Sequence, residues 1–305
     1  MRIAVFPGQG SQSPGFLSPW LALDGAAERL AEYSEWSGVD LIAAGTEWDA
    51  DRIRDTQVAQ PLIVAASLLS WNALESRDDV DGVAGHSVGE FAAAAAAGIL
   101  SEEDALRLVG IRGRAMAEAA AAERTGMSAV IGGDEASVVA RLEELALTPA
   151  NYNGGGQLVA AGALDGLQAL SAEPPTGTRV IALQVAGAFH TRYMAPAVQT
   201  LRTAAASVAA SDPRVTIWTN RDGSTVDTGA RFVELLVDQV ASPVRWDLCM
   251  ASFAAEGVSG IVELTPAGTL AGLAKRALRG VPSVAVKTPD DLAAATTLLT
   301  AAVEA

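Results

Sequence analysis

Residues Gly82–Leu100 read GVAGHSVGEFAAAAAAGIL: a short apolar strand, a Gly-x-Ser-x-Gly turn centred on Ser87 and an alanine-rich helix. A serine between a strand and a helix in this pattern is typical of a nucleophile elbow. The two glycines permit a sharp turn, and the helix directs backbone N–H groups toward a developing oxyanion. Chance alone gives ~0.2 matches of the bare pattern in such a chain. An ordinary glycine-rich turn is therefore the alternative.

Strands and helices alternate on both sides of this elbow. Before it, the pattern predicts a strand over 2–6 and a buried helix over 59–74, and after it a helix over 101–122. The alternation returns beyond residue 190 and continues to a final helix that starts near residue 289. Such an order predicts an α/β fold with a mainly parallel sheet, which we describe as an α/β-hydrolase-like large lobe.

The middle of the chain has a different character. Strand-like segments at 127–132, 148–153, 157–162 and 179–185 enclose helical segments at 134–145 and 164–172. The order βαββαβ predicts a ferredoxin-like unit. We therefore expect a small lobe at 120–187 inserted into a large catalytic lobe made of 1–119 and 188–305.

The composition limits the class of protein. The chain has 305 residues, of which 50% are hydrophobic, a net charge of −15, two histidines and one cysteine, Cys249. A single cysteine excludes an intrachain disulfide and, with two histidines, argues against a structural zinc site. The negative charge disfavours nucleic acid as a partner. With no apolar run near ~20 residues and no signal peptide, we expect a cytoplasmic protein without a membrane contact.

A reactive serine needs a general base. His86 adjoins Ser87, and its side chain should point away from the nucleophile, which leaves His190 in GAFHTRYM as the candidate. A satisfied core or surface histidine is the alternative for His190. No carboxylate between Ser87 and His190 stands out as the third member of a triad. A backbone carbonyl could hold the imidazole instead, which would suit an easily attacked substrate such as a thioester.

Arg112 falls on the apolar face of the helix predicted over 102–121, whereas Arg107 and Arg114 fall off it. A buried charge is costly unless it is paired. Arg112 therefore needs a carboxylate partner, either from the protein or from a substrate. An internal salt bridge or a snorkelling side chain is the alternative to a substrate-binding role.

Six motifs along the chain together resemble the family of malonyl-CoA:acyl-carrier-protein transacylases. They cover almost the whole chain in the order seen in that family: FPGQGSQ (6–12), GHSVGEF (85–91), GIRGRAM (110–116), NYNGGGQLVAAG (151–162), GAFHTRYM (187–194) and DQVASPVRW (238–246). Val88 and Phe91 replace the leucine and tyrosine that are more common at the elbow of the family.

The resemblance implies roles for the catalytic residues. Ser87 corresponds to the acylated nucleophile and His190 to its base. Gln239 corresponds to the glutamine whose backbone carbonyl holds the histidine. The backbone N–H groups of Gln9 and Val88 correspond to the oxyanion hole.

The resemblance also implies substrate-binding roles. Arg112 corresponds to the arginine that pairs with the free carboxylate of a malonyl group, and Phe189 to the malonyl-type residue before the histidine. Asn151 and Asn153 correspond to a small-lobe segment near the cleft. The exposed basic cluster Lys275, Arg276 and Arg279 is our candidate for docking an acidic carrier protein; a solvated helix face is the alternative.

By this resemblance we expect malonyl transfer from malonyl-CoA to the phosphopantetheine thiol of acyl carrier protein through a malonyl-serine, which supplies fatty-acid synthesis. The expected enzyme needs no cofactor and no metal, and acts as a monomer. A free-standing polyketide-synthase acyltransferase is the nearest alternative. A serine esterase or thioesterase and a nonenzymatic carrier-binding scaffold are more distant ones.

Overall fold

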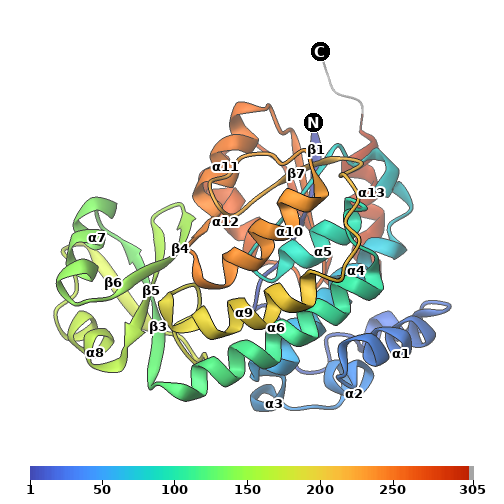
Figure 1. Cartoon of the computed structure of the whole chain (residues 1–305). Helices are drawn as coiled ribbons and strands as arrows, with labels where there is room; N and C mark the ends of the chain where they lie inside the picture. Colours follow the sequence, from blue (N-terminus) through green and yellow to red (C-terminus); the bar gives the residue numbers. More distant parts are fainter. Residues whose placement is uncertain (302–305) are drawn as a thin grey trace.

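The computed structural model describes residues 1–301 as two β-sheets with helices packed around them (Figure 1). The first sheet has the order β10-β9-β1-β2-β7, and every pair in it is parallel. Its strands are β1 (Arg2–Phe6), β2 (Gly82–Gly85), β7 (Thr216–Trp218), β9 (Gly260–Glu263) and β10 (Ser283–Ala285). The mainly parallel sheet predicted from the alternating pattern is confirmed.

Helices cover both faces of this parallel sheet. Each face of the sheet packs against its own apolar core. In strand β1, Ala4 and Phe6 belong to one core and Ile3 and Val5 to the other. The first core takes residues from α4 (Thr56–Ala73), α5 (Gly89–Ala96), α6 (Glu102–Ala122), α9 (Ala195–Ala205), α10 (Gly229–Asp238) and α13 (Leu292–Thr300). The second takes residues from α11 (Trp246–Ala255) and α12 (Thr269–Ala277). Alternate residues of a strand point to opposite faces, so both faces are buried, as in α/β proteins.

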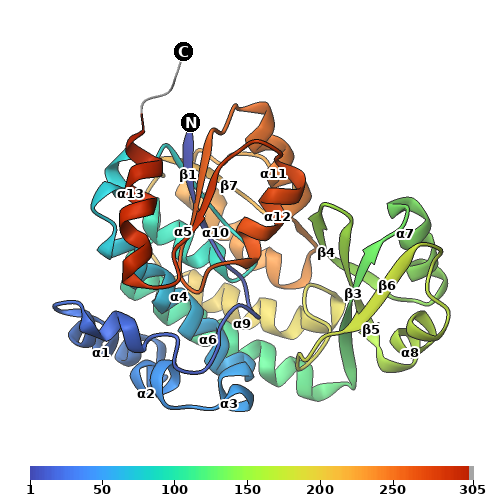
Figure 2. The same cartoon turned by 180° about the vertical axis from the view of Figure 1, so that it is seen from behind.

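The second sheet has the order β6-β3-β5-β4-β8, and Figure 2 shows it beside the parallel sheet. Its strands are β3 (Thr125–Gly132), β4 (Thr148–Gly154), β5 (Gln157–Ala163), β6 (Thr178–Ala182) and β8 (Val244–Arg245). Helices α7 (Glu135–Glu144) and α8 (Leu164–Ala172) pack on one face of this sheet. The order βαββαβ over 125–182 matches the predicted ferredoxin-like unit.

Strand β8 comes from a distant part of the sequence. It pairs in parallel with β4 through Asn151↔Val244 and Tyr152↔Arg245. The segment that follows Gln239 therefore ties the second sheet to the parallel one. The lobe boundaries at 120 and 187 stay a prediction.

The segment before residue 55 contains three helices to which the sequence pattern assigned no element: α1 (Ala26–Ser37), α2 (Leu41–Thr46) and α3 (Ala50–Arg54). Aspartates cap the last two, because Asp40 accepts from the N–H of Ala43 in α2 and Asp49 from that of Arg52 in α3. Short 3-10 helices lie at Ser18–Ala22, Glu75–Asp79, Arg192–Met194, Gln239–Ala241 and Pro289–Asp291.

Candidate active site

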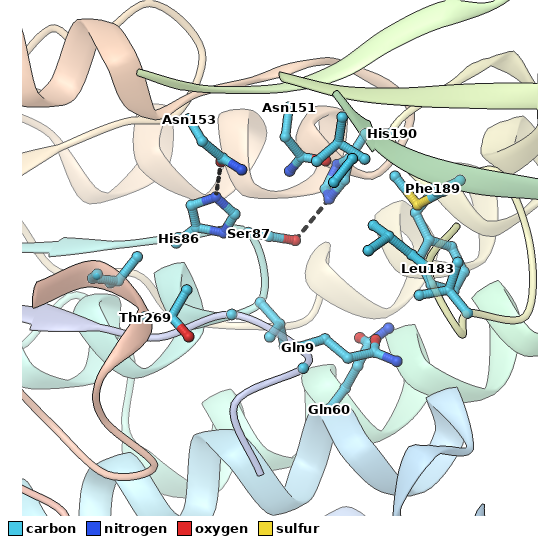
Figure 3. Close-up of a pocket in the computed structure, with 18 of the residues that line it drawn as sticks. Gln9, Gln60, His86, Ser87, Asn151, Asn153, Leu183, Phe189, His190 and Thr269 are labelled. Atoms are coloured by element: carbon cyan, nitrogen blue, oxygen red, sulfur yellow. Dashed lines mark hydrogen bonds between the residues drawn. The ribbon is translucent and has the colours of Figure 1, made fainter. Parts of the chain in front are cut away.

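A cavity of about 290 Å³ lies between the two sheets. The parallel sheet and its helices contribute Ser87, His190 and Arg112 to the lining, and the second sheet contributes Asn151 and Asn153. Figure 3 shows Ser87 in this cavity with its oxygen directed at His190. The candidate residues from distant parts of the sequence therefore meet at one place.

Ser87 occupies the turn between β2 and α5 with a φ of 51°. A positive φ is costly for a residue with a side chain, and strain of this kind is typical of a nucleophile elbow. A Cβ on Gly85 would lie 2.1 Å from the backbone nitrogen of Glu90, and one on Gly89 would lie 2.1 Å from the carbonyl oxygen of Phe6. Both glycines are therefore needed to bring the helix against the sheet.

His190 lies within hydrogen-bond distance of Ser87. The distance from Ser87 Oγ to His190 Nε2 is 2.7 Å, and the distance from His190 Nδ1 to the backbone carbonyl oxygen of Gln239 is 2.9 Å. A carbonyl can only accept, so Nδ1 carries the proton and Nε2 is free to accept from the serine hydroxyl. This arrangement gives a serine–histidine dyad in which a backbone carbonyl takes the place of the triad carboxylate.

The dyad histidine is electrically neutral at physiological pH. His190 is buried, and burial together with the positive charge of Arg112 lowers its pKa from 6.5 to about 3. Both causes disfavour the protonated ring. The imidazole is therefore available as a base over the whole physiological range.

Arg112 is 1% exposed and projects from α6 beside the nucleophile, with Nη2 3.5 Å from Ser87 Oγ. Its Nη1 donates to Oε1 of Gln60 at 2.6 Å and its Nη2 to Oε1 of Gln239 at 2.8 Å. Burial lowers its pKa to about 10, while the nearby Glu90 raises it, so the guanidinium stays charged at neutral pH. No salt bridge within 4.0 Å pairs Arg112 with a carboxylate in residues 1–301.

A second polar layer lies behind the elbow. Asn220 accepts from the backbone N–H of Ser87 at 2.7 Å and donates to the carbonyl oxygen of Gly85 at 2.7 Å. Its own backbone N–H donates to Glu90 Oε1 at 2.7 Å, and Gln239 Nε2 donates to the other oxygen of the same carboxyl group. Burial raises the pKa of Glu90 to about 7, although these hydrogen bonds and Arg112 oppose the rise.

Gln9 and Val88 are the residues expected to form the oxyanion hole. Both line the cavity, and neither backbone N–H donates to a backbone carbonyl in the part of the chain that the structure describes. Within residues 1–301, two buried side-chain donors near the cavity also lack a hydrogen-bond partner: Nε2 of Gln9 and Nε of Arg112. Unpaired buried donors cost about 1–3 kcal/mol each, so these groups favour a ligand with acceptor oxygens.

The opposite wall comes from the second sheet. Asn153 Oδ1 lies 2.9 Å from Nε2 of His86, and Figure 3 shows the two side chains directed at each other. Asn151 and Phe189 are buried and also line the cavity. His86 also lines the cavity, and its ring bonds to Asn153 rather than to the side chain of Ser87.

One member of the basic cluster, Arg276, contacts a residue that lines the cavity. Lys275 and Arg276 are exposed near the end of α12, and Arg279 is exposed just beyond it. The start of α12 lines the cavity through Thr269, and Arg276 Nη2 donates to Oε1 of Gln157 at 3.2 Å. Gln157 belongs to the cavity lining on the other wall.

Sequence reasoning missed three buried polar residues of this site: Gln60, Glu90 and Asn220. For each of them, a feature of the sequence could have indicated a role in the site. Gln60 interrupts the apolar run of α4, and Glu90 is the one charged residue in the first turn of the alanine-rich helix α5. Asn220 follows β7 at the carboxyl edge of the parallel sheet, where α/β sites form.

Within residues 1–301 no helix is both long enough and apolar enough to span a membrane. Over the same residues, no group of three or more histidine, cysteine or acidic side chains is arranged to hold a metal ion.

Comparison with known proteins agrees with this geometry. Residues 4–298 match the model of the family described as the acyl transferase domain. A malonyl CoA-acyl carrier protein transacylase of Mycobacterium tuberculosis is 54% identical over 296 residues, which are 96% of this chain and 98% of that protein. One of the same description from Escherichia coli is 33% identical, over 95% and 97% of the two chains.

Solved structures give the same result. A crystal structure of MCAT from Mycobacterium tuberculosis has a TM-score of 0.93 at 53% identity, over 96% of this chain and 98% of that one. A malonyl-transacylase in complex with the type II PKS acyl-carrier protein AntF has a TM-score of 0.90 at 30% identity, over 97% and 98%.

Proposed function

The chain belongs to the acyl transferase family, and on that premise we propose that it moves a malonyl group from malonyl-CoA to the thiol of an acyl carrier protein. It is an acyltransferase, and it acts through a malonyl-serine at Ser87. The structural neighbour in complex with a carrier protein supports a carrier as the acceptor.

The first step acylates the serine. His190 Nε2 takes the proton of Ser87 Oγ as the oxygen attacks the thioester carbonyl carbon. The backbone N–H groups of Gln9 and Val88 stabilise the negative charge that develops on the carbonyl oxygen. The C–S bond then breaks, and the sulfur of CoA leaves with the proton from His190.

The second step reverses the first with a new thiol. The phosphopantetheine thiol of the carrier gives its proton to His190, and its sulfur attacks the carbonyl carbon of the malonyl-serine. The bond to Ser87 Oγ breaks, and His190 returns the proton to that oxygen. Water competes for the same ester, so the cavity has to favour a long thin arm over solvent.

The environment of Arg112 is the main support for malonyl as the acyl group. It is a buried cation 3.5 Å from Ser87 Oγ, without a salt bridge to a carboxylate in residues 1–301. A buried charge needs a partner. An acyl group that brings its own carboxylate supplies one, whereas an acetyl group does not.

Intact-protein mass spectrometry tests the proposal. The protein is mixed with malonyl-CoA, and carrier protein is then added, with Ser87→Ala as the control. A malonyl adduct that needs Ser87 and moves to the carrier supports the transacylase. An adduct that decays equally fast without carrier would favour a thioesterase, and no adduct with any acyl-CoA would favour a scaffold without activity.

The exposed cluster Lys275, Arg276 and Arg279 is our proposed docking surface for the carrier. Exposed cations on the helix that begins at the cavity suit an acidic protein whose arm must reach Ser87, and Arg276 contacts the lining residue Gln157. Replacing Lys275 and Arg279 by glutamate should raise the KM for the carrier while the KM for malonyl-CoA stays unchanged. An unchanged KM for the carrier would remove the cluster from docking.

We further propose that the enzyme supplies fatty-acid synthesis, works as a monomer in the cytoplasm and needs no cofactor. The second candidate is supply of a polyketide synthase, which the relative bound to a type II PKS carrier favours. Comparing transfer rates to a fatty-acid carrier and a polyketide carrier distinguishes them, because the physiological carrier should have the higher kcat/KM.

A further inference from the structure

Gln239 contacts residues of the site both through its backbone carbonyl and through its side chain. Its carbonyl oxygen holds Nδ1 of His190. Its side-chain Oε1 accepts from Nη2 of Arg112 at 2.8 Å, and its Nε2 donates to the carbonyl oxygen of Ser87 at 2.8 Å. One buried side chain therefore joins the guanidinium to the nucleophile elbow.

Glu90 in turn holds this side chain. Its carboxyl group is 1% exposed and receives two N–H groups, one from Gln239 Nε2 and one from the backbone of Asn220. A carboxylate accepts both, because it has acceptors on both oxygens. A glutamine at position 90 would instead present an N–H group to one of the two donors. The site is thus built for a carboxylate at this position.

We propose that Glu90, acting through the side-chain amide of Gln239, is a positioning residue that orients Arg112 toward acyl groups that carry a carboxylate. The inference rests on the proposed function, because the carboxylate in question is that of the malonyl group. Neither Glu90 nor Gln239 lines the cavity, so each acts on the substrate through other residues, and Arg112 is the one that distinguishes malonyl from acetyl.

The orientation of Arg112 depends on two anchors. Nη1 is held by Gln60 and Nη2 by Gln239. Because a guanidinium is planar and rigid, two anchors fix both its plane and the direction of the remaining donors. Nε finds no hydrogen-bond partner among residues 1–301 and is a donor left for a ligand. Removing the Gln239 anchor lets the plane turn and misdirects these donors.

Electrostatics alone predicts the opposite result. Glu90 carries a negative charge near Arg112, so its removal would strengthen the attraction of Arg112 for a second carboxylate. Positioning predicts weaker recognition of malonyl, whereas charge alone predicts stronger recognition. The sign of the change therefore distinguishes the two effects.

The experiment compares kcat/KM for acylation of Ser87 by malonyl-CoA and by acetyl-CoA in Glu90→Gln and in Gln239→Met. The methionine keeps the backbone carbonyl and nearly the volume of the side chain. Assays at pH 8.5 keep Glu90 and Arg112 ionised in the wild type. We expect the malonyl-to-acetyl ratio to fall about tenfold in each variant.

The double variant adds a second test. If Glu90 acts through Gln239, the ratio in Glu90→Gln/Gln239→Met should be no lower than in the single variants, because the two changes break one connection. An unchanged ratio, a raised ratio or additive losses would each overturn the inference. A parallel loss of both acyl groups counts as an unchanged ratio.

Glu263→Gln is the matched control. Glu263 is another fully buried carboxyl group, which accepts the backbone N–H groups of Gly268, Leu270 and Ala271. Its loss should lower Tm and leave the malonyl-to-acetyl ratio unchanged. Failure of the proposed function would appear differently, as a wild-type protein that forms no malonyl adduct at Ser87.

Discussion

The two walls of the cavity are held in different ways. On the wall of the parallel sheet, hydrogen bonds run without interruption from Glu90 through Gln239 to Arg112 and to Ser87. On the wall of the second sheet, mainly small and apolar residues face the cavity: Met127, Ala129, Val159, Leu183 and Val185. Among its polar lining residues, Asn153 bonds with His86 and Gln157 with Arg276.

This difference between the walls indicates that the first positions the reacting atoms and the second shapes the cavity. A chain of directional hydrogen bonds fixes atoms to within a few tenths of an ångström, which proton transfer and oxyanion stabilisation require. Apolar packing fixes a surface but tolerates small changes in it. Substitutions on the first wall should therefore stop a step of the reaction, whereas those on the second should change its rate only modestly.

His190→Ala should have the largest effect among these substitutions. The serine loses the base to which it is bonded at 2.7 Å, so acylation should fall about 10²- to 10⁴-fold with either acyl group. Pre-steady-state release of CoA measures it, with far-UV circular dichroism to check the fold. Unchanged acylation would remove His190 from the mechanism and the contrast between the walls with it.

Arg112→Ala sharpens the same contrast by separating two substrates. Acylation by malonyl-CoA should fall about 10- to 100-fold, because a charged, buried hydrogen-bond partner of the carboxylate is lost. Acylation by acetyl-CoA should be spared or should rise. Competition between the two thioesters, read by mass spectrometry, gives the ratio directly. Equal losses in a folded protein would contradict the assigned role.

The pH dependence tests the electrostatics of the first wall. An ordinary histidine with a pKa of about 6.5 would lose about tenfold in base concentration between pH 7.5 and 5.5. Burial and Arg112 lower the pKa of His190 to about 3, so its neutral form should persist over that range. Acylation by acetyl-CoA in Glu90→Gln, which removes the carboxyl group titrating near pH 7, should therefore stay nearly flat. A tenfold fall would mean that His190 keeps an ordinary pKa.

The sequence predicted the elements that carry strong local signals. The Gly-x-Ser-x-Gly pattern located the elbow, and Ser101 does cap α6 by accepting from the N–H of Asp104. The apolar face of α6 predicted that Arg112 is buried, which is confirmed. The order βαββαβ over 125–182 was also predicted, because the hydrophobic periodicity of each element and the residues of each turn are local features of the sequence.

Contacts between distant segments could not be predicted in this way. The pairing of β8 with β4 joins residues about a hundred positions apart, and no local pattern encodes it. The backbone carbonyl of Gln239 holds His190, and sequence reasoning missed Glu90 because its carboxyl group bonds to Gln239 rather than to His190. The motif pointed to Gln239 only by resemblance, and nothing in the pattern indicated that its side chain would contact Arg112.

Asn153→Ala tests the second wall and should have the smallest effect. The change removes the acceptor of His86 Nε2, and an unsatisfied buried N–H costs about 1–3 kcal/mol, so Tm should fall by a few degrees. Acylation of Ser87 should fall only about threefold, because Asn153 holds neither the nucleophile nor its base. Thermal melts and acylation rates check both, with Asn151→Ala as the control. A loss comparable to that of His190→Ala would show that this wall takes part in the chemistry, since shape alone cannot account for a thousandfold effect.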